Sequence, residues 1–247
     1  MEHIEDKRPR VEMVPKKPSA FHFLMSHLFE FIWWLVVAWF IAILTEWGGM
    51  WLFWKDAGAG HSETMLITEV GYIQNDVHLR YLGGQTPIGF ATQFATHADY
   101  YIFEWTHIRD FLAWCTSIPD HANRAMVMLR HVIVGGSEYI TAAINTTQIF
   151  AVRLAVAIMS SPLFLLVGTV ALIDGMVERE LRRFGGAVES AFMYHNVKPW
   201  AKPVVVGGFV TYLGFPEAIH PNVILVPFAI IFGGVVFVTA KTFKKFI

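Results

Sequence analysis

Charged residues are scarce in this chain, and this scarcity excludes most soluble folds. Charged side chains make up 16% of the 247 residues, whereas average soluble domains carry about 25%. The formal net charge is only -1, so the chain lacks an overall basic field for nucleic acid. A single cysteine, Cys115, excludes an intrachain disulfide. Because hydrophobic residues reach 55%, the composition favours an integral membrane protein over a soluble enzyme.

Motifs for nucleophilic and nucleotide-dependent catalysis are also absent. Ser137 lies in Gly-Gly-Ser-Glu, which differs from the Gly-x-Ser-x-Gly turn of serine hydrolases. Gly185-Gly186 alone does not make a Walker-type phosphate loop. We therefore expect no enzymatic activity, no cofactor and no direct contact with nucleic acid.

Long apolar stretches occur near residues 27–47, 148–173, 199–215 and 222–240. A helix of about 20 residues rises about 30 Å, which matches the hydrocarbon core of a bilayer. The sequence therefore predicts an all-α integral membrane protein with four transmembrane helices and a helical extracytoplasmic domain. The third stretch is short, so a re-entrant or interfacial segment is its alternative.

The basic residues indicate how these helices are oriented. Of the 19 lysines and arginines, 13 lie in the N-terminal tail, the loop 174–203 and the C-terminal tail. Basic residues close to a span resist translocation across the membrane. Both termini are therefore predicted to be cytoplasmic, in a multi-pass membrane protein.

These boundaries divide the chain into seven predicted segments. They are a disordered cytoplasmic tail (1–19), a first transmembrane helix (20–47), an extracytoplasmic helical domain (48–147), a second transmembrane helix (148–173), a charged cytoplasmic loop (174–198), a transmembrane hairpin of helices three and four (199–240) and a basic C-terminal tail (241–247).

Apolar stripes at helical spacing predict three amphipathic helices in the extracytoplasmic domain. Gly135-Gly136 ends the third, and Ser137 begins a helix that runs into the second span and ends near Ile173. The stripes are Leu66, Val70, Ile73 and Val77; Phe90, Phe94, Ala98, Tyr101, Trp105, Ile108 and Leu112; and Ala122, Met126, Leu129 and Ile133.

Two charges lie near the predicted outer ends of the first two spans. Charges at this depth are costly unless they are paired or face water. We predict a structural ion pair between Glu46 and Arg153. The alternative is that each side chain reaches the lipid headgroups separately.

Histidines are frequent in the extracytoplasmic segment, which holds six of the 11. Glu104 and His107 have the i,i+3 spacing of metal-binding helix pairs. A membrane metalloenzyme is therefore an alternative, although so many histidines and glutamates make such a spacing common by chance. We expect no bound metal. The residues of this alternative are His97, Asp99, Glu104 and His107.

The most distinctive segment runs from Asp174 to Lys198. It reads Glu-Arg-Glu-Leu-Arg-Arg-Phe-Gly-Gly at 178–186 and Tyr-His-Asn at 194–196. The chain resembles a family of membrane proteins encoded in integrating conjugative elements and some conjugative plasmids. The resemblance implies an inner-membrane accessory of type IV secretion-like DNA transfer, located beside the coupling ATPase.

We therefore expect a non-enzymatic scaffold that binds other membrane proteins of the transfer apparatus, with the coupling ATPase as a candidate partner. The lipid bilayer surrounds it, and a homo-oligomer is a further candidate arrangement. A small oligomeric channel or transporter is the alternative function. The residues predicted to bind a partner are Arg179, Arg182, Arg183, Phe184, Tyr194 and His195, with Trp200 as a further apolar anchor.

Overall fold

The computed structural model describes residues 20–76, 87–119, 123–185 and 191–243, and every regular element in these ranges is a helix. The predicted all-α fold is therefore confirmed for this part of the chain. The helices are α1 (Ala20–Leu52), α2 (Gly60–Asp76), α3 (Pro87–Asp99), the π-helical turn η1 (Tyr100–Glu104), α4 (Ile108–Ser117), α5 (Arg124–Gly135), α6 (Ser137–Phe184), α7 (Ala191–Val197), the 3₁₀ turn η2 (Lys198–Trp200), α8 (Ala201–Gly214) and α9 (Pro221–Lys241).

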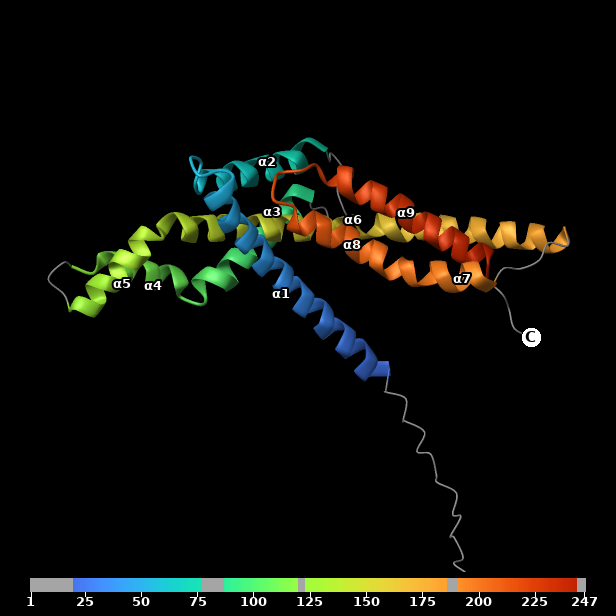
Figure 1. The fold of residues 1–247 in the computed structure, drawn as a ribbon, viewed down its shortest axis with the longest axis horizontal. Coiled ribbons are helices and arrows are strands. Elements are labelled where there is room, and N and C mark those ends of the chain that lie inside the picture. Colours follow the sequence, from blue (N-terminus) through green and yellow to red (C-terminus); the bar gives the residue numbers. More distant parts are fainter. Residues whose placement is uncertain (1–19, 77–86, 120–122, 186–190, 244–247) are drawn as a thin grey trace, which may run out of the picture. The chain divides into compact units, whose positions relative to one another are not determined.

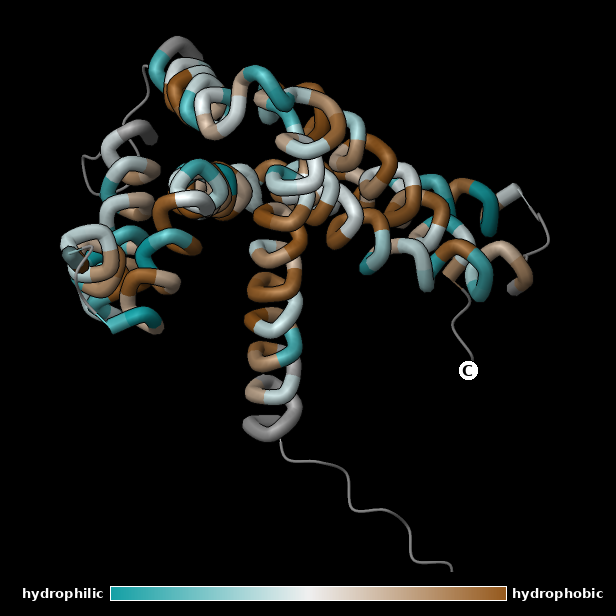
Figure 2. The backbone as a smooth tube through the Cα atoms, turned by 60° about the vertical axis from the view of Figure 1, so that its left-hand side comes forward, coloured by the Kyte–Doolittle hydropathy of each residue, from teal (hydrophilic) through white to brown (hydrophobic). Residues whose placement is uncertain are grey.

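The chain divides into two compact units, Met1–Val37 and Ala38–Ile247, and α1 contributes to both. In the first unit, large apolar side chains of α1 such as Phe29 and Trp34 are exposed. The hydrophobic run along α1 is visible in Figure 2. Such an apolar, exposed helix is typical of a segment that lies in lipid. The predicted tail, residues 1–19, lies outside the described residues.

Three of the described helices are long and apolar enough to cross a membrane, namely Leu28–Leu52 of α1, α6 and α9. Helix α8, in the third predicted span, has 14 residues, which is about 21 Å of helix and less than the hydrocarbon core needs. It continues directly from α7 and η2, so the helical run is longer than α8 alone. Three of the four predicted spans therefore coincide with helices of sufficient length.

The longest described helix is α6, with 48 residues and a length of about 72 Å. We predicted that it begins at Ser137 and ends near Ile173, but it continues to Phe184. The added residues are mostly Glu, Arg and Leu, which favour helix. The helix ends where Gly185 follows, as glycine commonly does after a helix. The first part of the predicted loop is therefore helical.

Helix α9 packs along α6, and α8 packs on α9 to form a helical hairpin (Figure 1). Two glycines allow the helices to approach closely. A Cβ atom at Gly175 would lie 2.6 Å from the carbonyl oxygen of Phe237 and 2.7 Å from the Cβ of Ala240. At Gly208, a Cβ would lie 2.9 Å from the Cβ of Phe228. Larger residues at these positions would force the helices apart.

The core lies where α2 and α3 cover α6 and meet α8 and α9. Ile73 is buried, and Leu66 and Val70 pack against the same cluster. The first predicted stripe is therefore confirmed over these three residues. Its last member, Val77, lies outside the described residues.

The second predicted stripe does not form one helix. Helix α3 ends at Asp99, η1 follows, and His107 adopts a left-handed backbone with a φ of 56° before α4 begins. A π-helical turn and a left-handed residue both change the direction in which the following side chains point. Consequently Tyr101 and Trp105, which we expected in the core, are exposed. Only the first part of the stripe, including Phe94, packs against the core.

The third predicted stripe lies mostly on α5, and it is not buried either. No residue of α5 is buried, and Met126 is exposed. Ala122, the first member of the stripe, lies outside the described residues. The α4 and α5 segment therefore has a small core, in which Phe103, Cys115 and Ile118 are buried.

Candidate functional site

The charged C-terminal ends of α6 and α9 lie together and form the first candidate site. Helix α7 packs beside the end of α9 (Figure 1). We call the residues around these ends, 178–184, 194–198 and 241–243, the helix-end cluster. It contains all six residues that the sequence predicted to bind a partner.

Two contacts fix the end of α9 to α6. Lys241 Nζ donates to Glu178 Oε1 at 2.9 Å, and Arg182 Nη2 donates to the carbonyl oxygen of Lys241. A cation at the last carbonyls of a helix compensates the partial negative charge there. Arg182, predicted to bind a partner, is therefore used inside the fold.

The helix-end cluster also contains contacts between cations and aromatic rings. Arg179 Cζ lies 5.5 Å from the centroid of the Phe243 ring, which lies 5.6 Å from that of Tyr194. Lys198 Nζ lies 5.2 Å from the centroid of the Tyr194 ring. Each cation–π contact contributes about 0.5–1 kcal/mol at an exposed site. Tyr194 and Arg179, also predicted to bind a partner, thus pack against neighbours within the cluster.

The other three predicted residues are open to contact. Arg183 Nη1 lies 3.2 Å from Glu180 Oε2, and these side chains are 56% and 51% exposed. An exposed pair of this kind contributes about 0–1 kcal/mol. Phe184 is 89% exposed, and His195 is exposed as well. The fold gains little from these side chains, so they are free to contact another molecule.

Sequence reasoning missed two further apolar residues of this surface. Leu181 and Phe192 are exposed, as is the expected anchor Trp200. Large apolar residues inside a charge-dense segment are the signal that would have found them. Leu181 lies three residues before Phe184 on α6, so these two exposed side chains share one helix face.

A buried ion pair forms the second candidate site, where α2, α6 and the α8–α9 turn meet. The side chains of Arg153 and Glu69 are each 1% exposed. Arg153 Nε and Nη2 donate to Glu69 Oε1 at 3.0 and 2.6 Å. Nη1 and Nη2 also donate to the carbonyl oxygens of Phe215 and Glu217, each at 2.6 Å. One guanidinium thus connects two helices and a turn.

The surroundings of this pair are largely apolar. The Tyr212 ring centroid lies 5.7 Å from Arg153 Cζ, and the Tyr212 hydroxyl is buried without a hydrogen-bond partner among the described residues. Burial raises the pKa of the Glu69 carboxyl, while the charge of Arg153 acts in the opposite direction. Buried ions cost several kcal/mol each unless good hydrogen bonds compensate. The four hydrogen bonds from Arg153 supply this compensation.

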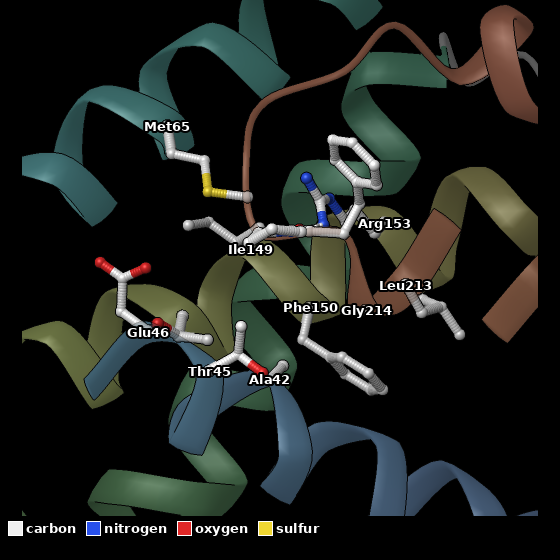
Figure 3. Close-up of a pocket in the computed structure, with 12 residues that line it drawn as sticks. Ala42, Thr45, Glu46, Met65, Ile149, Phe150, Arg153, Leu213 and Gly214 are labelled. Carbon is white, nitrogen blue, oxygen red and sulfur yellow. Dashed lines mark hydrogen bonds between the residues drawn. The ribbon is translucent and has the colours of Figure 1, made fainter. Parts of the chain in front are cut away.

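Glu46, the predicted partner of Arg153, contacts His61 instead. The Glu46 carboxylate oxygens lie 3.1 and 3.2 Å from His61 Nδ1, and the His61 ring stacks on Trp54. Figure 3 shows Glu46 and Arg153 on different sides of a cavity that both line. Counting residues along the spans placed the two at similar depth, but it did not show which partner each helix face meets.

The cavity between these residues is too small for a ligand. It measures about 20 Å³, which is room for about one water molecule. Its lining is mostly apolar and includes Met65, Ile149 and Phe150 (Figure 3). We therefore assign it to packing between the helices.

Glu69 itself was missed, although the sequence carries a signal for it. It lies three residues after Leu66 and four before Ile73, on the apolar face of α2. A carboxylate on the buried face of an amphipathic helix requires a buried partner. The only predicted span that carries an arginine is the one with Arg153.

The metal alternative rests on four side chains: His97, Asp99, Glu104 and His107. Asp99 Oδ1 accepts from Arg109 Nη2 at 2.7 Å, and His107 Nδ1 lies 2.8 Å from Asp110 Oδ2. Arg109 Nη1 also lies 4.0 Å from Glu104 Oε1. Over the described ranges, no three His, Cys, Asp or Glu side chains are arranged to hold a metal ion.

The comparisons with known proteins identify one family. The family described as IncC plasmid conjugative DNA transfer protein DtrJ-like matches residues 53–244. No curated protein and no solved structure matches the chain. The matched segment begins directly after α1 and contains the helix-end cluster and the ion pair of Glu69 and Arg153.

Proposed function

The chain belongs to the DtrJ-like family of conjugative DNA transfer proteins, and from this premise we propose that it is a non-enzymatic subunit of a conjugation apparatus in the bacterial inner membrane. Three apolar helices of sufficient length support the membrane assignment. The protein scaffolds other membrane proteins of a type IV secretion-like apparatus, and its candidate partner is the coupling ATPase.

The proposed topology has four spans with both termini in the cytoplasm. The basic residues of the helix-end cluster then lie at the inner surface and residues 48–147 lie outside. Helix α8 crosses together with the helical residues that precede it, because α8 alone is short. The antiparallel hairpin of α8 and α9 supports this arrangement, since its turn carries no Lys or Arg.

The proposed partner surface is the exposed part of the helix-end cluster. The observation that carries it is the 89% exposure of Phe184 beside Arg183 at the end of two apolar helices. Exposed aromatic residues and arginine are the types that contribute most to protein interfaces. Phe192 and His195 of α7, which packs against α9, are exposed as well.

The channel alternative has less support. Polar side chains available for a path through the membrane bond within their own helix: Ser160 donates to Val156 O at 2.8 Å and Thr169 donates to Leu165 O at 2.7 Å. Arg153 is occupied by Glu69 and two carbonyl groups. Ion flux in proteoliposomes of the purified protein is the measurement that would favour the channel.

The partner surface is tested in a donor cell that lacks the native gene. We expect the double variant Arg183→Glu with Phe184→Ser to insert normally but to lose co-purification of the coupling ATPase and to lower DNA transfer at least tenfold, because a hot-spot residue contributes about 2 kcal/mol or more. Arg124→Glu changes an exposed arginine of α5 and should behave like the wild type. Unchanged co-purification and transfer in the double variant would contradict the proposal.

Sidedness is tested by thiol labelling in a Cys115→Ser background. We expect an impermeant reagent to label Ser117→Cys in intact spheroplasts and Asn196→Cys only after the membrane is opened. Both positions are exposed. The opposite pattern would place the helix-end cluster outside and overturn the scaffold topology.

A further inference from the structure

The helix-end cluster holds more cations than its carboxylates neutralise. Glu178 pairs with Lys241, and Glu180 pairs with Arg183. Arg182 donates to a carbonyl oxygen. Within the described ranges, no carboxylate pairs with the other basic residues of this region. These remaining cations are Arg179, Lys198 and Lys202.

Arg179 is held in place without a polar partner. Its guanidinium lies over the Phe243 ring, with 5.5 Å from Cζ to the ring centroid. Its Nε is buried and has no hydrogen-bond partner in the part of the chain that the structure describes. A buried donor without an acceptor is costly, at about 1–3 kcal/mol in general. The site therefore favours an added acceptor beyond those that the described residues supply.

Lys198 also contacts an aromatic ring. Its Nζ lies 5.2 Å from the ring centroid of Tyr194, and the Tyr194 ring contacts that of Phe243. Lys202 follows four residues later in the same helical run, so both lysines lie on one helix face. One arginine and one lysine thus each contact one of these two adjoining rings.

The helix ends do not account for these cations. The carbonyl oxygen of Lys241 at the end of α9 already accepts from Arg182. Arg179 lies more than one turn before the end of α6 at Phe184, where the helix dipole has little effect. The helix-end charges are therefore compensated by other residues.

We propose that Arg179 and Lys198 bind the phosphate groups of anionic phospholipids, with Lys202 as an additional cation. The proposal rests on the cytoplasmic position of the helix-end cluster given under the proposed function. Two apolar helices, α6 and α9, end at this site, so the cations lie where hydrocarbon gives way to lipid headgroups. Basic pockets between helices on the cytoplasmic side are known to bind such headgroups.

The neighbouring side chains favour a lipid over a nucleic acid. Trp200 is 62% exposed and Phe243 is 43% exposed beside the cations. Aromatic side chains of this kind are enriched at the membrane interface. A nucleic-acid site would need a longer basic track to follow several phosphates, whereas this site offers two fixed cations and one further lysine.

The experiment uses the full-length protein purified in a neutral detergent. Phosphatidylglycerol, phosphatidylcholine, inorganic phosphate and a short single-stranded oligonucleotide are added separately. Thermal unfolding and native mass spectrometry measure stabilisation and bound ligand. We expect phosphatidylglycerol to raise Tm and to remain bound, and we expect the other three to have little effect.

Variants assign the effect to these residues. Arg179→Gln with Lys198→Gln should weaken phosphatidylglycerol binding on the order of thirtyfold, because each basic residue near the surface contributes similarly to anionic-lipid binding. Lys198→Gln alone changes an exposed side chain, so it keeps the test valid if the double variant does not fold. Arg124→Gln removes an exposed cation of α5, outside the helix-end cluster, and should keep wild-type binding.

Several outcomes would overturn the proposal. Equal binding of phosphatidylglycerol and phosphatidylcholine, or wild-type binding by Lys198→Gln and the double variant, would reject the site. A stronger effect of inorganic phosphate would indicate a free anion, and a stronger effect of the oligonucleotide would indicate nucleic acid. Thiol labelling separates the two proposals: an outward-facing Asn196→Cys rejects both, whereas lost lipid selectivity with correct sidedness rejects the lipid site alone.

Discussion

The ion pair of Glu69 and Arg153 and the helix-end cluster use the same residue types in opposite ways. Arg153 is 1% exposed and donates four hydrogen bonds to described residues. Arg183 is 56% exposed and lies 3.2 Å from one exposed carboxylate. The two arginines lie on the same helix, α6, 30 residues apart, which is about 45 Å. This distance is close to the full thickness of a bilayer with its headgroups.

The exposed fraction and the hydrogen bonds of each arginine indicate whether it stabilises the fold or is available for contact. A buried charge is retained only when every partner is in place, because its desolvation costs several kcal/mol. An exposed charge costs little and contributes little, at about 0–1 kcal/mol per pair. Residues for recognition are therefore expected at the helix-end cluster, and residues for stability at the Arg153 site.

The largest expected effect comes from Arg153→Met. This change leaves Glu69 as a buried carboxylate without a cation, and breaking a buried pair in this way costs about 3–5 kcal/mol. Thermal unfolding of the detergent-purified protein, followed by circular dichroism, measures the loss. We expect Tm to fall strongly and expression in the membrane to drop.

The double variant Arg153→Met with Glu69→Met is the control. It removes both charges, so it should recover part of the lost Tm. Recovery remains incomplete because the carbonyl groups of Phe215 and Glu217 lose their donor. If Arg153→Met were as stable as the wild type, the ion pair would not hold α6 to α2 and to the α8–α9 turn.

The sequence predicted that Arg153 pairs with a carboxylate but not that Glu69 supplies it. Arg153 was recognised because a charge in an apolar span requires a partner. The choice of Glu46 followed from depth along the spans, and depth contains no information about helix rotation. The long-range fold decides the partner, since Glu69 comes from α2 and lies 84 positions away in the chain.

The next largest effect is expected from Gly175→Val, which tests the packing beneath the helix-end cluster. A Cβ here would lie 2.6 Å from the Phe237 carbonyl oxygen, and main chain does not move aside as a flexible side chain does. Overpacking of this kind costs about 1–3 kcal/mol. We expect a lower Tm in the same unfolding assay.

Gly234→Ala on α9 is the matched control for Gly175→Val. A Cβ at Gly234 meets no atom within 4 Å. Alanine also favours helix by up to about 1 kcal/mol over glycine. Tm should therefore stay constant or rise slightly. An equal fall in both variants would show that the loss does not come from close packing of α6 and α9.

The third prediction separates two adjacent arginines of α6. Arg182→Gln removes the donor to the Lys241 carbonyl oxygen and should cost about 1–2 kcal/mol. Arg183→Gln removes only an exposed pair with Glu180 and should change the unfolding free energy by less than about 0.5 kcal/mol. Equal losses of unfolding free energy in the two variants would contradict the assignment of Arg182 to the fold and of Arg183 to the exposed surface.

The different roles of Arg182 and Arg183 could have been predicted from the spacing of residues along α6, although we did not predict them. The face of α6 that packs on α9 includes Gly168, Gly175 and Arg182, in steps of seven residues. Steps of three, four and seven keep residues on one helix face. Arg182 therefore continues the buried face, whereas Arg183 is rotated away from it by one residue. The i,i+4 spacing in residues 178–183 predicted a short helix there, and Gly185 and Gly186 its end. What the sequence did not show is that this helix continues α6 without a break and so carries this face beyond the apolar run.

The smallest effect on stability is expected from Phe184→Ser. The ring is 89% exposed, so its removal should change the unfolding free energy by less than about 0.5 kcal/mol. Co-purification of the partner should nevertheless fall at least tenfold. An exposed aromatic residue among charged side chains is expected to contribute mainly to binding. The comparison with Arg182→Gln is decisive, since that variant should lose stability. If Phe184→Ser lowered Tm as much as Arg182→Gln while transfer stayed normal, Phe184 would belong to the fold, and the contrast between a buried structural site and an exposed contact site would not hold.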